Sequence, residues 1–302
     1  PEVFKLLKEF KNDIIVVGGY ATPTGMAAIL YLKAKKIPFY LNCDGGFIGN
    51  DSLFKKKIKI FFIGSANYYL STGVGADKYL VYYGAEKERI YHYSFTSLRK
   101  EDIEVKVKTG DEKVSLRNKL GITEKNMIVF VGSFIHRKGI DILLNACKDM
   151  EDTAVVLVGG SDISAYKEIV SEKFKEHIYP VGFKNKEEIK KYYQAADLMV
   201  LPTREDIWGL VINEAMAQGL PVVTTNRCLA GLTLVKNGEN GYIVPVEDVK
   251  ATKEAIEKIF EDGSAAELGR KSLEKIRDYT IERMAAEHRD IFAESRNFDK
   301  VD

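Results

Sequence analysis

Short apolar runs rich in β-branched residues alternate with longer amphipathic stretches along most of the chain. In the first third, the runs predict strands at residues 13–19, 38–42 and 90–93. Helical spacing predicts helices at residues 1–10 and 23–36. Continuous apolar strands that alternate with helices are typical of a parallel sheet covered on both faces. The sequence therefore predicts an α/β fold.

A second series of the same kind follows a polar, linker-like stretch at residues 106–120, which leads into a helix. Its connections are only a few residues long, as is usual in α/β units. The strands are expected at residues 127–131, 154–158, 178–181, 198–201 and 221–224, and the helices at 139–148, 164–175, 187–196, 209–218, 249–260 and 267–292.

Two doubly wound domains joined by a linker account for this pattern. We expect the first over residues 1–108, the second over 109–280, and a C-terminal helix at 281–302 that packs back towards the first. The first domain is expected to lack its N-terminal part, because the chain starts in a helix rather than in a strand and loop. Ligands of open α/β sheets bind outside the carboxyl ends of the strands.

Composition narrows the classes of protein to consider. The chain has 302 residues, of which 45% are hydrophobic, enough for one large core or two medium ones. The net charge is +1, whereas a nucleic-acid-binding protein would show a strong basic excess. Three widely spaced cysteines exclude a disulfide framework and a zinc ribbon, so we expect a cytoplasmic protein. No apolar run in the sequence approaches the roughly 20 residues of a membrane-spanning helix.

Charge is distributed unevenly between the two parts of the chain. Residues 1–110 carry a net charge of +6 and the remainder carries −5. Part of the basic excess lies at residues 51–63, where four lysines are interspersed with apolar side chains. A basic amphipathic helix can lie on the inner, anionic face of a membrane. Alternatively, its phenylalanines belong to the core and its lysines are simply solvated.

The string LPTREDIWGLVINEAMAQGLPVVT, near the middle of the second domain, carries the strongest chemical signal. A buried strand leads through a polar loop into a helix that opens at Gly209, so the amides of Leu210 and Val211 are unpaired helix-start donors. Such a helix start binds anions. Asp206 and Glu214 can accept hydrogen bonds from sugar hydroxyls. Alternatively, Asp206 is a helix N-terminal charge and Glu214 is a solvated surface residue.

The string VFVGSFIHRKG covers the first strand of the second domain and the loop that follows. The strand ends in Gly132 and Ser133, and the loop carries Arg137 and Lys138 into a helix at Gly139. An arginine fork and a lysine charge in this position can clamp a diphosphate. The alternative is a solvated basic turn.

Together these strings resemble glycosyltransferase family 4, retaining enzymes of the GT-B fold that use nucleotide-activated sugars. The family signature has two acids with seven residues between them, and the matching string starts at Asp206 and has Glu214 as its second acid. The family's R-K-G element matches Arg137-Lys138-Gly139. The strings PVGF and YYQAADLMVLP also resemble the family, and the resemblance covers roughly residues 125–225 and, more weakly, the part before.

The resemblance implies a GT-B fold, two Rossmann-like doubly wound domains with a cleft between them, the first incomplete. It implies that Arg137 and Lys138 neutralise the leaving diphosphate. Asp206 would bind the hydroxyls of the donor sugar and Glu214 the nucleotide ribose. Two cations and a helix start would stabilise the leaving charge without a metal or other cofactor. The base of the nucleotide would lie near the turn at residues 181–183. The remaining donor contacts would come from Gly132, Ser133, Val181, Gly182, Phe183, Gly209, Leu210 and Val211.

The sequence departs from the family pattern in two places. Asp206 stands where most members have glutamate, with Glu205 beside it. Many members also carry a histidine after the strand at residues 38–42, where this chain has Cys43 and Asp44. Asp44, which two glycines follow, becomes the candidate for contact with the acceptor hydroxyl. Alternatively, it caps a turn before the next helix.

The resemblance implies transfer of a sugar from a UDP- or GDP-sugar to a glycan or lipid-linked acceptor, with retention of configuration. The implied setting is the synthesis of a cell-surface polysaccharide or glycolipid, with no nucleic-acid partner. The alternatives are a non-catalytic protein that binds a nucleotide sugar and another GT-B enzyme such as a sugar epimerase. Turnover of the donor separates a binding protein from a transferase.

Overall fold

The computed structural model describes residues 2–10 and 13–298, with side chains up to Ser295. It divides into two units. Glu282–Asp302 belong with Pro1–Phe95 in the first unit, and Thr96–Ile281 form the second. Pro1, expected in the opening helix, and residues 299–302 of the expected C-terminal helix lie outside the described residues.

The boundary between the units lies after Phe95 rather than after residue 108 as predicted. The intervening residues belong to the second unit because their backbone is bonded to it. The backbone amide of Glu104 donates to the carbonyl oxygen of Ala217 at 2.8 Å, and Gln218 Nε2 donates to the carbonyl oxygen of Asp102 at 2.9 Å.

The first unit contains a parallel sheet with strand order β1-β2-β3-β4. Apolar side chains of its strands and helices form two cores, and several tyrosines, among them Tyr69 and Tyr83, are buried in them. The strands are Val16–Val17, Tyr40–Cys43, Tyr68–Ser71 and Ile90–His92, and the helices are α1 (Glu2–Glu9), α2 (Pro23–Lys35), α3 (Leu53–Ile63), α4 (Val74–Tyr82) and α13 (Ile281–Phe298).

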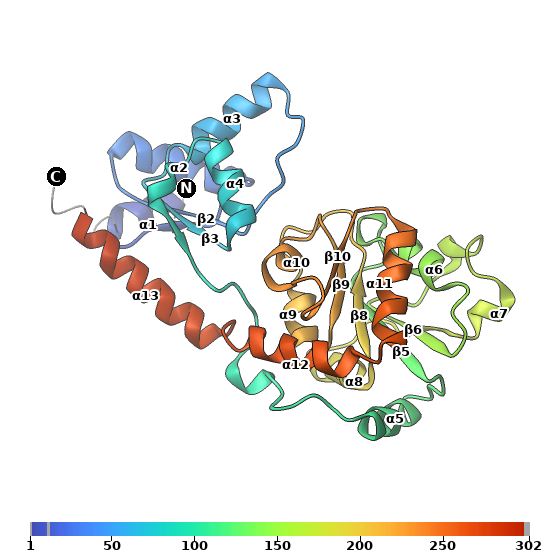
Figure 1. Ribbon diagram of the computed structural model, residues 1–302. Helices are drawn as coiled ribbons and strands as arrows, with labels where there is room; N and C mark the ends of the chain where they lie inside the picture. The colour runs from blue at the N-terminus through green and yellow to red at the C-terminus, as the bar shows by residue number, and fades with distance from the viewer. Residues whose placement is uncertain (1, 11–12, 299–302) are drawn as a thin grey trace. The chain divides into compact units, whose positions relative to one another are not determined.

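Helix α13 packs on the sheet of the first unit, although it follows the whole second unit in the sequence (Figure 1). The rings of Tyr40 and Phe292 lie 5.0 Å apart between centroids. Glu287 Oε2 accepts a hydrogen bond of 2.7 Å from the backbone amide of Ser94. These contacts tie β2 and the end of the unit's first segment to the helix.

The second unit contains a parallel sheet with strand order β10-β9-β8-β5-β6-β7. All side chains of β6, β8 and β9 are buried, as a sheet covered on both faces requires. Figure 1 shows α6 and α11 on one face of this sheet and α9 and α10 on the other. The strands are Asn126–Val131 (β5), Thr153–Val158 (β6), Ile178–Pro180 (β7), Leu198–Leu201 (β8), Val222–Thr225 (β9) and Gly241–Val244 (β10). The helices are Gly110–Lys119 (α5), Ile140–Cys147 (α6), Glu172–Lys175 (α7), Lys186–Ala195 (α8), Leu210–Ala217 (α9), Leu229–Leu234 (α10), Val249–Glu261 (α11) and Ala265–Ile276 (α12).

Two predicted helices are wrong in extent. The stretch at residues 164–175 contains only a 3₁₀ turn and the four-residue α7, because Ser171 caps a new helix by accepting from the amide of Phe174. The stretch at 267–292 is two helices rather than one, since the chain turns between Ile276 and Ile281. The amide of Ile281 donates to Leu98 at 2.7 Å and thereby fixes this turn.

Four elements were not placed by the sequence pattern: β3, α4, α10 and β10. Strand β10 begins at Gly241, where a Cβ atom would lie 1.9 Å from the carbonyl oxygen of Val222. Only glycine permits this approach, and the same glycine interrupts the apolar run by which a strand is recognised. Among the described helices, none combines the length and the apolar composition that crossing a membrane requires.

Candidate functional site

The order of strands in the second unit reverses between β5 and β8. From β5 the chain proceeds outward through β6 and β7, and from β8 it proceeds the other way through β9 and β10. In open α/β sheets, ligands bind at the carboxyl ends of the strands at such a switch point. The loop after β5 carries Arg137 and Lys138, and the loop after β8 carries Asp206. The topology therefore brings three of the predicted site residues to one place.

The two loops are bonded directly to each other. The amide of Arg204 and the hydroxyl of Thr203 both donate to the carbonyl oxygen of Arg137, at 2.8 and 2.9 Å. Gly139, which ends the R-K-G element, has a φ of +73°, and a Cβ atom there would lie 2.0 Å from the carbonyl oxygen of Pro202. Glycine is needed here for two reasons: it adopts the left-handed backbone without strain, and it has no Cβ atom to clash with Pro202.

Both cations of the first loop face Asp206. Lys138 Nζ lies 2.5 Å from Asp206 Oδ2, and Arg137 Nη1 lies 3.7 Å from Asp206 Oδ1. Arg137 Nη1 also donates to the carbonyl oxygen of Glu205 at 2.6 Å. The side chain of Arg137 is 47% exposed, whereas that of Lys138 is 14% exposed. Arg137 is thus the more accessible cation, and Asp206 is the anion that both hold.

Helix α9 starts beside this group. Its N-cap is Gly209, with a φ of +102° and no side-chain cap. A Cβ atom at Gly209 would lie 3.0 Å from Cys228 Sγ and 3.6 Å from Asp206 Oδ2. The helix start that carries Leu210 and Val211 is therefore close to Asp206, and it adds a positive dipole end to the two cations.

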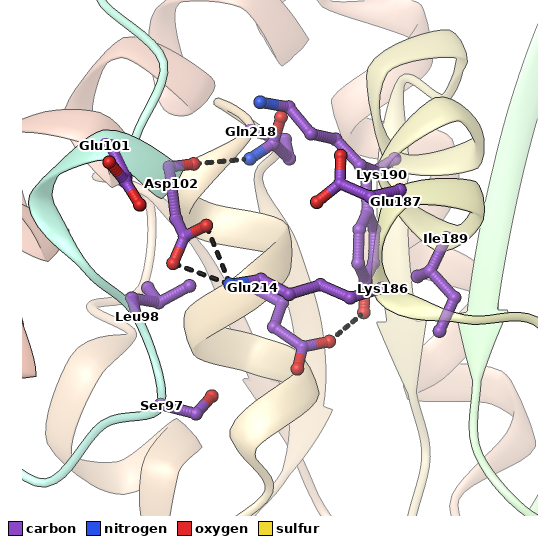
Figure 2. Close-up of a pocket in the computed structure, with 11 residues that line it drawn as sticks. Ser97, Leu98, Glu101, Asp102, Lys186, Glu187, Ile189, Lys190, Glu214 and Gln218 are labelled. Atoms are coloured by element: carbon purple, nitrogen blue, oxygen red, sulfur yellow. Dashed lines mark hydrogen bonds and ion pairs between the residues drawn. The ribbon is translucent and has the colours of Figure 1, made fainter.

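Glu214 lies one turn further along α9, in the lining of a cavity of about 620 Å³ (Figure 2). Tyr193 donates a hydrogen bond of 3.1 Å to Glu214 Oε2. Burial raises the pKa of Glu214, and the hydrogen bond from Tyr193 opposes that rise. The cavity is lined by Ser97, Leu98, Glu101, Asp102, Lys186, Glu187, Ile189, Lys190, Tyr193, Glu214 and Gln218.

An ion pair spans this cavity. Lys186 Nζ lies 2.7 Å from Asp102 Oδ1, and the backbone oxygen of Asp102 accepts from Gln218. Figure 2 shows Asp102 and Lys186 facing each other near Glu214. Asp206, Arg137 and Lys138 are not part of the cavity lining. The predicted site residues of the second unit thus fall into two groups, one at the β5 and β8 loops and one around Glu214.

The turn at Val181, Gly182 and Phe183 follows β7 and is bonded to the loop after β6. The amide of Gly182 donates to Gly160 at 3.1 Å, and the amide of Gly159 donates to Gly182 at 2.9 Å. Phe183 is 87% exposed. A flat aromatic face held at the carboxyl edge of the sheet can stack on a planar ligand.

Gly132 and Ser133 lie in the loop after β5, beside the end of β6. Gly132 donates to Val158 at 2.9 Å, and a Cβ atom at Gly159 would lie 2.3 Å from the carbonyl oxygen of Gly132. The backbone of Ser133 accepts from the amide of Ile135 at 2.9 Å. The glycines therefore let the loops after β5 and β6 touch at backbone level.

Asp44 belongs to the first unit, at the carboxyl end of β2. Its Oδ1 accepts a hydrogen bond of 2.9 Å from Asn42 Nδ2, and its carbonyl oxygen accepts one of 2.9 Å from Thr72 Oγ1. The next helix, α3, is capped by Ser52 rather than by Asp44. At the ends of β3 and β4, Asp77 accepts from Ser71 Oγ at 2.6 Å and pairs with His92 Nε2 at 2.7 Å.

No group of three His, Cys, Asp or Glu side chains, within the described part of the chain, is arranged to hold a metal ion. Arg137, Lys138, Asp206 and the helix start instead present charge that suits a bound anion.

Comparison with known proteins identifies the family of the chain. The family model described as "Glycosyl transferases group 1" matches residues 112–283, more than half of the chain. The chain belongs to the group 1 glycosyltransferases. The matched residues include both groups of predicted site residues in the second unit.

Curated relatives of this group 1 glycosyltransferase come from several organisms. An uncharacterized glycosyltransferase of Methanocaldococcus jannaschii, MJ1607, is 29% identical over 50% of this chain and 40% of its own length. The D-inositol 3-phosphate glycosyltransferase of Mycobacterium sp. (strain KMS) is 29% identical over 61% of this chain and 40% of its length. The chain thus matches about two fifths of the length of these relatives.

Solved structures show the fold of this group 1 glycosyltransferase. HepE of Anabaena has a TM-score of 0.79 at 16% identity and covers 97% of this chain and 82% of its own. Sucrose-phosphate synthase of Thermosynechococcus elongatus has a TM-score of 0.74 at 20% identity, with 91% and 72% covered. The predicted GT-B fold, with parallel sheets in two Rossmann-like domains, is confirmed.

Sequence reasoning missed several side chains of the site in this group 1 glycosyltransferase. Tyr193 lies within the string YYQAADLMVLP, which points to its segment but not to its hydrogen bond with Glu214. No sequence motif points to Asp102, because it reaches the cavity from a 3₁₀ turn that is far from Glu214 in the sequence. The sequence pattern places Arg204 in a polar loop and gives no further sign of its contacts.

Proposed function

We propose that the protein to which this chain belongs transfers a sugar from a UDP- or GDP-sugar to a glycan or lipid-linked acceptor, with retention of configuration. The observation that carries the proposal is the convergence of Arg137, Lys138 and the start of α9 on Asp206 at the switch point. Two cations and a helix start suit a diphosphate, and a carboxylate beside them suits the hydroxyls of the attached sugar.

The proposed reaction assigns a task to each group. Arg137 and Lys138 exchange part of their contact with Asp206 for the phosphate oxygens and stabilise the charge that develops as the diphosphate leaves. The amides of Leu210 and Val211 would add to this stabilisation, and Asp206 would hold the sugar. A front-side path, in which the leaving phosphate helps to deprotonate the acceptor hydroxyl, gives retention. Neither a metal nor another cofactor takes part.

The nucleoside half of the donor would lie beside Glu214, while the diphosphate lies at Arg137 and Lys138. An ionised carboxylate accepts two ribose hydroxyls, and Tyr193 holds it in place. The base would pack at the turn of Val181, Gly182 and Phe183, with Gly132 and Ser133 against the phosphates. HepE of Anabaena has been crystallised with UDP and with UDP and glucose, which supports this class of donor.

The proposal extends to the acceptor side and the cellular setting. Asp44 is proposed to accept a hydrogen bond from the acceptor hydroxyl. TarM of S. aureus has been crystallised with UDP and α-GlcNAc-glycerol, which supports a glycan-type acceptor. Relatives include a 41.2 kDa protein in the cps region of Klebsiella pneumoniae and an amylovoran biosynthesis glycosyltransferase of Erwinia amylovora. We propose synthesis of a cell-surface polysaccharide or glycolipid at the cytoplasmic face of the membrane.

Calorimetric titration of the chain with UDP, GDP and ADP tests the donor site. We expect one diphosphate to bind, and we expect the Arg137→Ala/Lys138→Ala variant to lose about 1.5–3 kcal/mol of binding free energy for each charge-assisted contact. Binding of none of the three, or equal binding by the variant, would contradict the proposed site. Sugar transfer is then measured with full-length protein, the matching labelled donor and a panel of acceptors.

A second candidate is a non-catalytic protein that binds a nucleotide sugar. It is favoured by Asp206 in place of the family's glutamate, since the shorter side chain is paired with Lys138. Another GT-B enzyme, such as a sugar epimerase, would also use the donor site. A binding protein would retain the donor unchanged, an epimerase would alter the sugar without an acceptor, and a transferase would require one.

A further inference from the structure

Arg204 lies in the loop after β8, and its guanidinium joins three separate segments. Nη1 donates to the carbonyl oxygen of His136 at 2.7 Å and to Asp141 Oδ1 at 2.9 Å. Nη2 donates to Asp141 Oδ2 at 2.7 Å, and Nε donates to Glu247 Oε1 at 2.8 Å. The side chain is only 16% exposed. One side chain thus connects the loop after β5, helix α6 and the loop after β10.

Glu247 reaches Arg204 from a strained backbone. Its φ is +62°, the left-handed region that residues other than glycine seldom adopt. Such conformations carry an energetic cost and persist where the surrounding structure requires them, often beside functional sites. Here the conformation accompanies the ion pair between the Glu247 carboxylate and Arg204 Nε.

The contacts of residue 204 fix the turn that carries the two cations. The side chain binds the carbonyl oxygen of His136, and the backbone amide of the same residue binds the carbonyl oxygen of Arg137 at 2.8 Å. Two consecutive peptide groups of the His136–Lys138 turn are therefore held by one residue. Since the turn is short, fixing its peptides also fixes where the side chains of Arg137 and Lys138 start.

We propose that Arg204, anchored by Asp141 and Glu247, is the positioning residue that holds the Arg137–Lys138 turn in the geometry for binding a nucleoside diphosphate. This inference rests on the proposed function, because it presumes that the turn binds a diphosphate. Arg204 acts through the turn and not by touching the ligand itself.

Only an arginine can fill this place. The bidentate pair with Asp141 uses two nitrogens, while Nε points to Glu247 and a further hydrogen reaches His136. A lysine ammonium carries three donors on one atom and cannot reproduce the planar fork. Arg204→Lys therefore keeps the charge and removes the geometry, which separates positioning from simple electrostatics.

The test compares the diphosphate with the matching nucleoside on the unmodified chain and two variants. Arg204→Lys should lower the affinity for the diphosphate about tenfold while the affinity for the nucleoside, followed by NMR titration, stays unchanged. Glu247→Gly removes one anchor and also relieves the left-handed backbone. We expect it to weaken diphosphate binding without lowering Tm, a combination that general destabilisation would not give.

Arg270→Lys is the control, because Arg270 makes exposed pairs with Glu267 and Glu274 on α12. It should bind both ligands as the unmodified chain does. If the unmodified chain binds no diphosphate, the proposed function is overturned and this inference with it. If the unmodified chain binds and both Arg204→Lys and Glu247→Gly bind equally well, the inference alone is overturned. Parallel loss of nucleoside and diphosphate binding in the variants would also overturn it.

Discussion

Single atoms decide much of the geometry of the candidate site. Gly139 shows this most directly, because its α-hydrogen faces the carbonyl oxygen of Pro202 where a Cβ atom would lie at 2.0 Å. The R-K-G element thus needs its glycine for packing against the loop after β8. The sequence string identified the element, but the reason for the glycine is visible only in the contact.

Substitution of Gly139 by alanine should be strongly destabilising. We expect a loss of more than about 2 kcal/mol of unfolding free energy, since left-handed backbone and a backbone clash act together. Gly182→Ala is the matched control, because Gly182 has a φ of +74° but no atom within 4 Å of its Cβ position. It should cost only about 1 kcal/mol. Urea unfolding measures both, and equal losses would show that the contact with Pro202 does not matter.

The carboxyl of Glu214 should make stability depend on pH. Burial raises its pKa above the ordinary value of 4.5, so the folded chain binds the proton of this carboxyl more tightly than the unfolded chain does. The stability that this group contributes is present below 4.5 and is lost as pH rises through the raised pKa. Glu214→Gln cannot titrate, so its Tm relative to the unmodified chain should rise across that interval. Thermal scans at closely spaced pH values would contradict this expectation if the two curves stayed parallel.

At the scale of elements, α3 agrees in part with each of the two interpretations of its sequence. Phe62 is buried, as a core residue would be, but Phe61 is 43% exposed, Leu53 82% and Phe54 75%. The lysines are also not uniformly solvated. Lys59 is 15% exposed and pairs with Asp51 at 2.8 Å, whereas Lys55 is 65% exposed. The helix therefore presents apolar and basic side chains together on its outer surface, which supports the proposed contact with an anionic membrane.

Vesicle sedimentation tests this surface. The chain should bind vesicles that contain phosphatidylglycerol and bind poorly to pure phosphatidylcholine, and Leu53→Glu/Phe54→Glu should reduce the binding about tenfold or more. Val105→Glu changes a side chain that is 85% exposed in the second unit and should have no effect. Binding that ignores lipid charge, or a double variant that binds as well as the unmodified chain, would rule out this role for α3.

Elements were predictable where apolar periodicity is strong. Strands β5, β6 and β8 follow from continuous buried runs, and the sequence places them within one residue of their observed ends. The predicted helix at residues 164–175 fails because Phe174 alone is buried in α7, so no apolar face holds a longer helix together. The cavity around Glu214 was beyond sequence reasoning, since Asp102 and Gln218 meet there only through the folded backbone.

At the scale of the whole molecule, the division into two units predicts that the donor binds to the second unit alone. Apart from Asp44, every residue proposed for the site, and the entire lining of the cavity at Glu214, belongs to Thr96–Ile281. That segment, expressed alone, should therefore bind the same diphosphate as the whole chain, within about threefold, a free-energy difference of under 1 kcal/mol. Calorimetry on both measures this. A folded segment that fails to bind would mean that the first unit supplies contacts to the nucleotide.

Helix α13 joins residues far apart in order of synthesis. The strands of the first unit's sheet are synthesised before the second unit, yet Tyr40 and Ser94 receive their partners Phe292 and Glu287 only after the whole second unit has been made. The second unit, by contrast, is complete once Ile281 has been made. The second unit can therefore fold on the ribosome before α13 covers Tyr40 and Tyr68 of the first unit. During that interval, the exposed face of the first sheet is where a chaperone would bind and where a stalled chain would aggregate.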